Sequence, residues 1–336
     1  MKRIHSLVTG GAGFVGSHLC DYLVAQGHHV TCVDNLITGR LENIAHLRHH
    51  PQFRFIHQDI VKGLPRFMAL PRFLKDVTRG FPRFLPKADY VFHLASPASP
   101  VGYMKNSIET ILTNSLGTYR LLEYCKQKGA AFVFASTSEV YGNPHVHPQV
   151  ETYWGNVNSF GPRSCYDESK RLGEALIYEY VHKYKVNARL VRIFNTYGPR
   201  LNENDGRVVS NLITQALHGH DLTVYGDGSQ TRSFCYVTDL VRGLWAAIST
   251  PHTQGEVFNL GNPQETTILK FAKTVKELCG KPGTKIVKKP LPQDDPIKRK
   301  PDISKAKKVL KWEPKVSLKE GLQHTIDYYR GRIKKH

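Results

Sequence analysis

The chain has 336 residues, 40% of them hydrophobic, and a formal net charge of +19 at neutral pH. This length accommodates one large domain or two smaller lobes, and no apolar run reaches the roughly 20 residues that a membrane-spanning helix needs. The positive charge favours acidic partners such as phosphorylated small molecules; since no nucleic-acid-binding motif accompanies it, neither nucleic acid nor a membrane is expected as a partner.

The six cysteines stand at irregular spacings without any Cys-x-x-Cys pair, at positions Cys20, Cys32, Cys125, Cys165, Cys235 and Cys279. Such spacing indicates neither a zinc site nor a disulfide framework. The residues before the first apolar segment are also too few for a signal peptide. The sequence therefore predicts reduced thiols, a cytoplasmic location and no bound metal.

A glycine-rich turn between a strand and a helix opens the chain. The apolar run 4–8 predicts the strand, and Gly10, Gly13 and Gly16 follow it before a helical pattern begins. Glycines at this spacing allow a tight turn and the close approach of a pyrophosphate to the positive end of a helix. Asp34 ends the next predicted strand, where a carboxylate binds a ribose diol and repels a 2′-phosphate. The pattern predicts a dinucleotide site that prefers NAD to NADP.

Polar residues follow the next predicted strands at their carboxyl ends. The strand 53–57 leads to Asp59 and Ile60, placed to flank an adenine ring, and the strand 90–95 leads to a turn of serines and prolines. Ligands of an open parallel sheet bind at these ends. One helix is then expected over 105–128.

Residues 64–85 interrupt the alternation of predicted strands and helices. They contain three copies of a short motif: Leu64-Pro65-Arg66-Phe67, Leu70-Pro71-Arg72-Phe73 and Phe81-Pro82-Arg83-Phe84. Prolines at this density disfavour an uninterrupted helix. We expect an irregular surface insertion without chemistry, and a basic, aromatic docking loop is the alternative.

Three hydroxyls and a carboxylate follow the strand 131–135, in the order Ser136, Thr137, Ser138 and Glu139. Beside a nicotinamide, such groups could hold a sugar and move a proton. A polar turn that only caps the next segment would have the same composition, so the pattern leaves both interpretations open.

Tyr166 and Lys170 lie four residues apart in a helix-forming run, so their side chains share one helix face. A phenol titrates near pH 10, and a neighbouring ammonium favours the phenolate form, which makes the pair a candidate base. The same Tyr-x-x-x-Lys pattern also arises by chance on surface helices. Its functional interpretation depends on the rest of the chain.

The alternation of strands and helices ends after the strand 188–193. Beyond it, strands and helices no longer alternate regularly. The pattern there predicts a short helix near 208–217, a strand at 222–225 and a helix near 239–248. Arg207 and Arg232 stand in this part, and a planar guanidinium forms bidentate bonds to phosphate oxygens, so both are candidates for binding a diphosphate.

The predicted fold class is α/β, with a Rossmann-type doubly wound parallel sheet and a smaller C-terminal substrate-binding lobe. We expect the NAD-binding domain over 1–196, with parts of about 233–260 returning to it. The second lobe is expected over 197–336, and it is the part that the family resemblance described next assigns to nucleotide-sugar binding.

Several motifs resemble a known family over nearly the whole chain. The glycine-rich turn together with Tyr-x-x-x-Lys is similar to the extended short-chain dehydrogenase/reductases, which act on nucleotide sugars. Longer runs resemble the UDP-glucuronate decarboxylases within that superfamily. These runs are 154–158, 161–166, 206–211, 229–234 and 294–302.

This resemblance implies that the protein converts UDP-glucuronate to UDP-xylose through a 4-keto intermediate, with NAD recycled. The implied catalytic residues are Tyr166, Lys170, Glu139, Thr137, Ser138 and Arg299. The implied NAD-binding residues are Gly10, Gly13, Phe14, Val15, Gly16, Asp34, Asn35, Asp59, Ile60, Leu94, Ser96, Thr113, Tyr166, Lys170 and Thr196. The implied residues for the UDP-sugar are Asn195, Arg207, Tyr225, Gln230, Arg232 and Arg299. A homodimer that packs helices 105–128 and 166–184 into a four-helix bundle is also implied.

Neighbouring activities remain as alternatives. The 4,6-dehydratases place Asp where this chain has Ser138, which protonates a leaving group poorly, so dehydration is disfavoured. The 4-epimerases usually lack a carboxylate at Glu139 and the segment of Arg299, and epimerisation is the enzymatic alternative. The family generally has Lys at the position of Leu112, where it is credited with contacting the substrate. Because Leu cannot form this charged contact, a catalytically impaired, NAD-binding regulatory protein is the non-enzymatic alternative.

Overall fold

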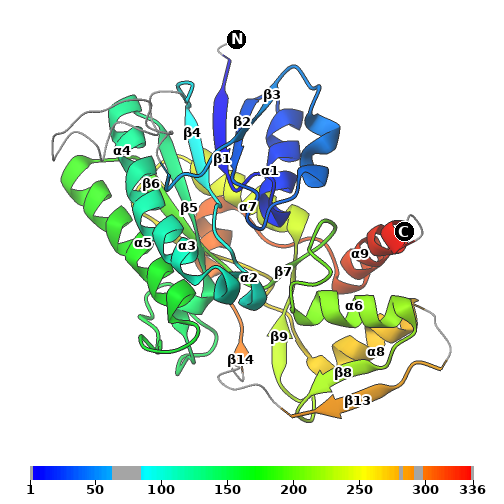
Figure 1. Ribbon diagram of the computed structural model, residues 1–336. Coiled ribbons are helices and arrows are strands. Elements are labelled where there is room, and N and C mark those ends of the chain that lie inside the picture. The colour runs from blue at the N-terminus through cyan, green and yellow to red at the C-terminus, as the bar shows by residue number, and fades with distance from the viewer. Residues whose placement is uncertain (1–2, 63–84, 280–282, 291–297, 334–336) are drawn as a thin grey trace.

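The computed structural model describes residues 3–62, 85–279, 283–290 and 298–333 (Figure 1). The predicted insertion at 64–85 lies outside the described residues except for Leu85, and so does the first part of the 294–302 run.

A seven-stranded sheet lies at the centre of the protein, in the order β11-β6-β5-β4-β1-β2-β3. All of its strand pairs are parallel. The strands are β1 His5–Thr9, β2 His29–Asp34, β3 Phe53–His57, β4 Tyr90–His93, β5 Ala131–Thr137, β6 Ala188–Ile193 and β11 Val257–Leu260. The chain runs outward from β1 in both directions, which confirms the predicted doubly wound sheet.

Helices cover both faces of this sheet (Figure 1). Helix α1, Phe14–Ala25, packs beside α7, Val237–Ser249, on one face, and α4, Thr118–Lys128, packs beside α5, Ser164–Tyr184, on the other. Neighbouring residues of one strand therefore enter different apolar clusters: Val8 belongs to the first and Leu7 to the second. Burial on both faces explains why the strands read as continuous apolar runs.

The helix predicted over 105–128 is confirmed over most of its length, since helical backbone continues from residue 107 to 128. It consists of α3, Ser107–Leu112, a π turn η3, Thr113–Gly117, and α4, and a shorter helix α2, Pro100–Lys105, precedes it. Asn106 leaves helical geometry between α2 and α3, and its side-chain amide donates to the carbonyl of Gly102 at 2.9 Å. In the π turn, Asn114 donates to Ser169 Oγ on α5 at 3.0 Å. The start of the helix and the π turn are the features that the periodicity did not predict.

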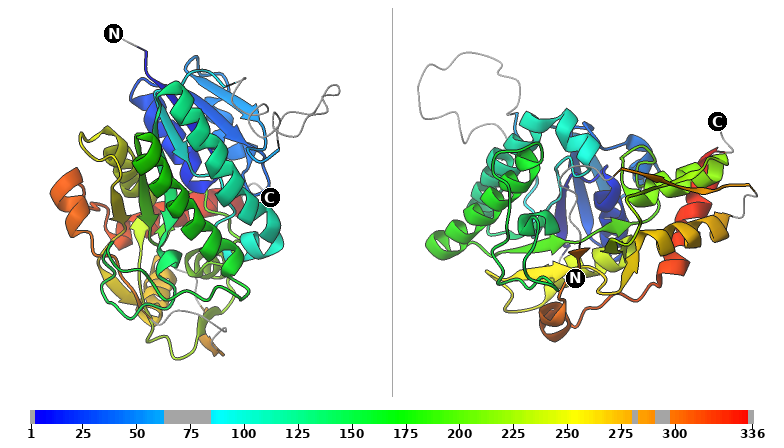
Figure 2. Two further views of the ribbon diagram at one scale, coloured as in Figure 1. Left: turned by 90° about the vertical axis from the view of Figure 1, so that its left-hand side faces the viewer. Right: turned by 90° about the horizontal axis from the view of Figure 1, so that it is seen from below.

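The rest of the chain forms a smaller lobe below the carboxyl edge of the sheet (Figure 2). Its strands are β7 Thr196–Tyr197, β8 Leu222–Tyr225, β9 Thr231–Ser233, β10 Cys235–Tyr236, β12 Glu265–Thr267, β13 Ile286–Lys289 and β14 Lys298–Arg299. Its helices are α6 Val208–His218, α8 Ile268–Cys279 and α9 Leu318–Ile333. Short helical turns elsewhere in the chain are η1 Leu41–Leu47 after β2, η4 Ser138–Tyr141 after β5 and η5 Ala306–Leu310 before α9. The pairing of β14 with β9 sets Arg299 opposite Arg232. Across the described ranges, no helix has the length and apolar character needed to span a membrane.

Candidate active site

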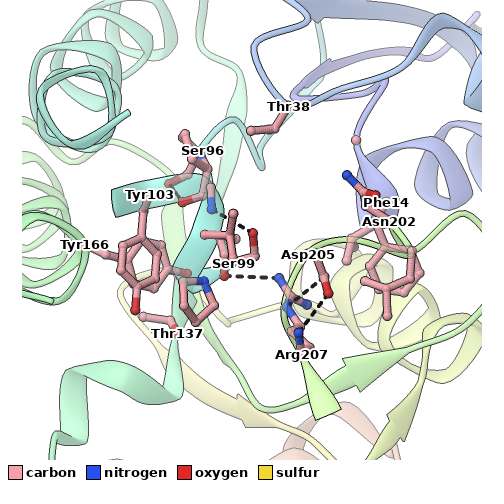
Figure 3. A pocket seen from close by; sticks show the side chains of 18 of the residues that line it. Phe14, Thr38, Ser96, Ser99, Tyr103, Thr137, Tyr166, Asn202, Asp205 and Arg207 are labelled. Atoms are coloured by element: carbon pink, nitrogen blue, oxygen red, sulfur yellow. Dashed lines mark hydrogen bonds and ion pairs between the residues drawn. The ribbon is translucent and has the colours of Figure 1, made fainter. Parts of the chain in front are cut away.

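A cleft of about 910 Å³ opens between the carboxyl edge of the sheet and the smaller lobe. Every residue predicted above for catalysis, NAD binding or substrate binding lines it. Figure 3 shows Tyr103, Tyr166 and Thr137 on one side of the cleft, with Phe14 and Arg207 on the other. The individual roles of these residues remain predictions, but their convergence on one cleft from distant parts of the chain is a property of the fold.

The glycine-rich turn fits a pyrophosphate. A Cβ on Gly16 would lie 2.1 Å from the carbonyl oxygen of Gly10, so only glycine permits this turn. Gly10 itself has φ of +74° and lies against the backbone of Ala95. Helix α1 starts just after Gly13, and no side chain of the described residues caps it. The first N–H groups of this helix are therefore suited to an anionic ligand.

Asp34, at the end of β2, presents a fixed carboxylate to the same cleft. Its two oxygens accept hydrogen bonds from the backbone N–H groups of Ala12, at 3.0 Å, and Leu36, at 2.8 Å. A Cβ on Gly39 would lie 2.8 Å from either oxygen, so glycine keeps this side of the carboxylate clear. Burial raises the pKa of Asp34, although both N–H donors oppose the shift. With the apolar side chain of Ile60 nearby in the lining, these groups fit the ribose and adenine of NAD.

Helix α5 brings Tyr166 and Lys170 into the cleft. Tyr166 is buried and stacks on Tyr103 with ring centroids 5.0 Å apart. Burial raises the pKa of Tyr166 to about 12, and a hydrogen bond with Thr137 opposes this only in part. The ammonium of Lys170 donates to the carbonyl of Ala135 at 2.7 Å and lies 5.7 Å from the centre of the Tyr166 ring. Within the chain itself, the pKa of the phenol therefore shifts upward, opposite to the direction expected from a lysine neighbour alone.

Glu139 lies on η4, directly after β5, between two arginines. Its Oε1 pairs with Nη1 of Arg299 and its Oε2 pairs with Nη2 of Arg163. Burial alone would raise the pKa of this carboxyl, but the two guanidinium groups lower it below its usual value. Arg299 also donates from Nη2 to the carbonyl of Gly142 at 3.2 Å. Glu139 is thus a fixed anion in contact with the cleft.

Two members of this arrangement were not predicted. Arg163 precedes α5, and its Nε lies 3.8 Å from Oδ2 of Asp167 in the first turn of that helix. Burial raises the pKa of Asp167 to about 7, and the negative charge of Glu139 adds to the shift. Arg163 stands in the 161–166 run and Asp167 lies within the Tyr-x-x-x-Lys pattern, so only their positions next to predicted residues could have signalled them. Arg299, Glu139, Arg163 and Asp167 are referred to below as the charge cluster.

The three predicted hydroxyls differ in what they contact. Ser136 donates to Oε1 of Glu174 at 2.5 Å, so its hydroxyl is engaged within the protein. Thr137 accepts from the backbone N–H of Glu139 at 3.2 Å and hydrogen-bonds with Tyr166. Ser138 is buried in the cleft lining. Thr137 and Ser138 are therefore the two hydroxyls placed to meet a ligand.

The smaller lobe contributes two arginines. Nε of Arg207 lies 3.2 Å from Oδ2 of Asp205, and its Nη2 donates to the carbonyl of Ala98 at 3.1 Å, as Figure 3 shows. Arg232 is buried and donates from Nη1 to the carbonyl of Thr231 at 2.9 Å. Asp205 was not predicted; it holds Arg207 at the mouth of the cleft. These cations suit a diphosphate at this end.

Comparison with known proteins agrees with this geometry. Residues 6–261 match the NAD dependent epimerase/dehydratase family. The chain belongs to this family. UDP-glucuronic acid decarboxylase 1 of Arabidopsis thaliana is 51% identical over 332 residues, which are 99% of this chain and 71% of that protein. UDP-glucuronic acid decarboxylase 1 of Xenopus tropicalis is also 51% identical, over 99% of this chain and 73% of that protein.

Solved structures of family members share the fold. UDP-glucuronic acid 4-epimerase from Bacillus cereus, in complex with UDP-glucuronic acid and NAD, superposes with a TM-score of 0.84 at 31% identity, covering 98% of this chain and all of that one. UDP-glucose 4-epimerase from Thermotoga maritima, with UDP-glucose, gives a TM-score of 0.85 at 33% identity over 98% of this chain and 100% of that one.

The position of Leu112 differs from what its family counterpart implies. Within the described residues, Leu112 is not part of the cleft lining; it lies at the end of α3 with 38% of its surface exposed. The exposed apolar side chains of α3 and α5, two helices in contact, are Ile108, Ile111, Leu112, Leu172 and Tyr178, and they are referred to below as the apolar surface on α3 and α5. In this conformation, the side chain at position 112 contributes to the outer face of the protein.

Proposed function

We propose that the protein decarboxylates UDP-glucuronate to UDP-xylose, with NAD as a recycled cofactor. The observation that carries the proposal is the fixed pair of Glu139 and Arg299 next to Tyr166 in the cleft. Epimerisation at C4 needs no chemistry at C5 or C6, whereas removal of a carboxylate needs charged groups at that end of the sugar. Relatives with half of their aligned residues identical and named as UDP-glucuronic acid decarboxylases support the same conclusion.

Oxidation at C4 is the first task of the cleft. NAD, when bound, supplies the acceptor for the C4 hydride and returns that hydride at the end. Tyr166 removes the proton of the 4-hydroxyl, which requires its pKa to fall from about 12. Positive charge near the phenol would supply this shift, and Lys170 lies on the same helix face to provide it. The hydroxyl of Thr137 forms a hydrogen bond with the same 4-hydroxyl oxygen and thereby orients the 4-hydroxyl toward Tyr166.

Decarboxylation follows from the ketone. The C6 carboxylate is then β to a carbonyl, so the C5–C6 bond can break with its electron pair delocalised onto the C4 oxygen as an enolate. Hydroxyls of Tyr166, Thr137 and Ser138 converge on that oxygen and stabilise its charge. C5 then takes a proton, and one proton is consumed in each turnover. Glu139 and Arg299 act around the carboxylate and C5.

The remaining roles belong to the same proposal. Arg207 and Arg232 bind the diphosphate, and a set in the smaller lobe positions the rest of the UDP-sugar. This set comprises Asn195, Tyr225 and Gln230. The domain division at about residue 196 and a cytoplasmic location are kept as predicted from the sequence.

A homodimer is proposed as the working assembly. The apolar surface on α3 and α5 supports it, since Ile108 is 62% exposed and Tyr178 is 60% exposed. Several exposed apolar side chains on two helices that contact one another are typical of an interaction surface. Two copies that pair through α3, α4 and α5 would cover it in a bundle, and Leu112 would then lie within the interface.

The deciding experiment incubates the purified protein with UDP-glucuronate and NAD and follows both products. We expect carbon dioxide and UDP-xylose in equal amounts, with no net NADH. Tyr166→Phe serves as the inactive control. UDP-galacturonate without carbon dioxide would make the protein an epimerase, and binding without turnover would make it a regulatory protein.

A further inference from the structure

The charge cluster alternates guanidinium and carboxyl groups from the cleft into the protein. Arg299, Glu139 and Arg163 line the cleft; Arg163 pairs with the second oxygen of Glu139, and Asp167 lies behind Arg163. Asp167 is not among the lining residues of the described part of the chain. It therefore acts on a ligand only through the residues in front of it.

Asp167 is poorly satisfied as an anion. Its side chain is buried, with the residue 6% exposed, and Oδ1 has no hydrogen-bond partner in the described ranges. Among the described residues, Oδ2 has only the 3.8 Å ion pair with Nε of Arg163. A buried carboxylate normally has several donors, whereas a protonated carboxyl needs fewer. The pKa of about 7, raised by burial and by Glu139, is the consequence of this environment.

Titratable and charged groups surround Asp167 from several elements. They are Glu139 on η4, Arg163 before α5, Arg299 on β14, Tyr103 on α2, and Tyr166 and Glu168 on its own helix. Among the four members of the charge cluster, two guanidinium groups face two carboxyl groups. The cluster is neutral when Asp167 is ionised and carries one positive charge when Asp167 is protonated.

The sugar carboxylate of the proposed substrate changes this balance, and this step rests on the proposed function. A third carboxylate next to Arg299 would give an ionised cluster a net negative charge in a buried place. Like charges at short range in such surroundings repel strongly. One proton on Asp167 restores neutrality without breaking the pairs of Glu139.

We propose that Asp167 is a positioning residue that takes up a proton when a sugar carboxylate binds, and thereby keeps Arg163 paired with Glu139. When the carboxylate leaves as carbon dioxide, the cluster regains its positive charge and Asp167 releases its proton. A ligand without a carboxylate causes no such change. The protonation state of Asp167 thus follows the presence of the group that the enzyme removes.

The test measures proton uptake on binding by titration calorimetry, in buffers of different ionisation enthalpy. Tyr166→Phe with NAD bound is the background, so that the ligand binds without reacting. At pH 7.5 we expect roughly half a proton or more per site with UDP-glucuronate, because an acid with a pKa of about 7 is mostly ionised there. UDP-xylose, which lacks the carboxylate, is expected to take up almost none.

Variants test whether Asp167 is the residue that takes up the proton. Adding Asp167→Asn should abolish uptake with UDP-glucuronate, and Asp167→Glu should retain it. The matched control is Glu179→Gln, which removes an exposed carboxylate of the same helix and should leave uptake unchanged. Equal uptake with both ligands, or undiminished uptake in Asp167→Asn, overturns the inference. If Asp167→Asn fails to fold, the ligand comparison and Asp167→Glu still decide.

This result is separable from the proposed function. Carbon dioxide release from the parent chain tests the function by itself. If the parent chain decarboxylates UDP-glucuronate but shows no proton uptake that depends on Asp167, only the inference is overturned. If proton uptake occurs but the parent chain does not decarboxylate, only the proposed function is overturned.

Discussion

Replacement of Lys170 by Met should stabilise the folded chain at low pH while it removes a residue that the proposed mechanism requires. The ammonium of Lys170 is buried, and within the described part of the chain it donates to the carbonyl of Ala135 at 2.7 Å. Methionine has a similar length and carries no charge into the same space. The change therefore tests the cost of keeping a cation at this place.

The size of the effect follows from the pKa. The pKa of Lys170 is lowered from 10.5 to about 7, because burial disfavours the ammonium form. The unfolded chain then binds more protons than the folded chain, so the stability of the parent rises with pH through this interval. Integration of the proton difference from pH 6.5 to pH 8.5 gives a gain of about 2 kcal/mol from this residue.

Urea unfolding without added NAD measures the prediction at those two pH values. The stability advantage of Lys170→Met over the parent should shrink by about 2 kcal/mol between pH 6.5 and pH 8.5. Lys128→Met, at an exposed position of α4, is the matched control and should differ from the parent equally at both. A constant difference for Lys170→Met would refute the idea that the buried ammonium is penalised.

Four further predictions follow from the cleft and the α3–α5 surface. Tyr166→Phe should lower the rate of carbon dioxide release by about 10²–10⁴-fold while NAD binding is retained, as measured by fluorescence titration. Gly16→Ala should abolish NAD binding in the same titration, because its Cβ would lie 2.1 Å from a backbone oxygen of the turn. Arg207→Ala should raise the Kd for UDP by about 10–100-fold in calorimetry, the worth of a charged hydrogen bond. Ile108→Glu should place a charge in the proposed interface, so sedimentation should give the mass of one 38.1 kDa chain, whereas the parent should sediment as a dimer.

The sheet could be predicted closely because its signals are local. A strand covered on both faces is a continuous run of buried, mostly apolar residues, and the predicted strand 131–135 lies within β5, which is buried at every residue. The helix over 105–128 could be predicted from periodicity, but not its interruption at Asn106 or the π turn at Asn114, where side chains contact the Gly102 carbonyl and Ser169. Those contacts depend on tertiary structure, which a helical pattern does not encode.

The site was predictable where strand ends determine it. Thr137, Ser138 and Glu139 follow β5, and parallel strands bring such ends to one edge. The charge cluster was not predictable in this way, since Glu139 and Arg299 are 160 residues apart and only the family resemblance connected them. The spacing of Tyr166 and Lys170 predicted that their side chains share one helix face, but it did not predict that both are buried. The direction of the pKa shift at the phenol was therefore missed.

Helix α5 carries an acid and a base that both favour their neutral forms. Asp167 and Lys170 are three residues apart, and burial brings the pKa of each to about 7, upward for the carboxyl and downward for the ammonium. The chain alone thus keeps its own buried charge low around the phenol. Negative charge beside these groups favours the protonated form of each: a sugar carboxylate favours the proton on Asp167, and an anionic Tyr166 phenolate favours the ammonium of Lys170. The protonation of the two residues therefore follows the charges of the groups that bind or form beside them.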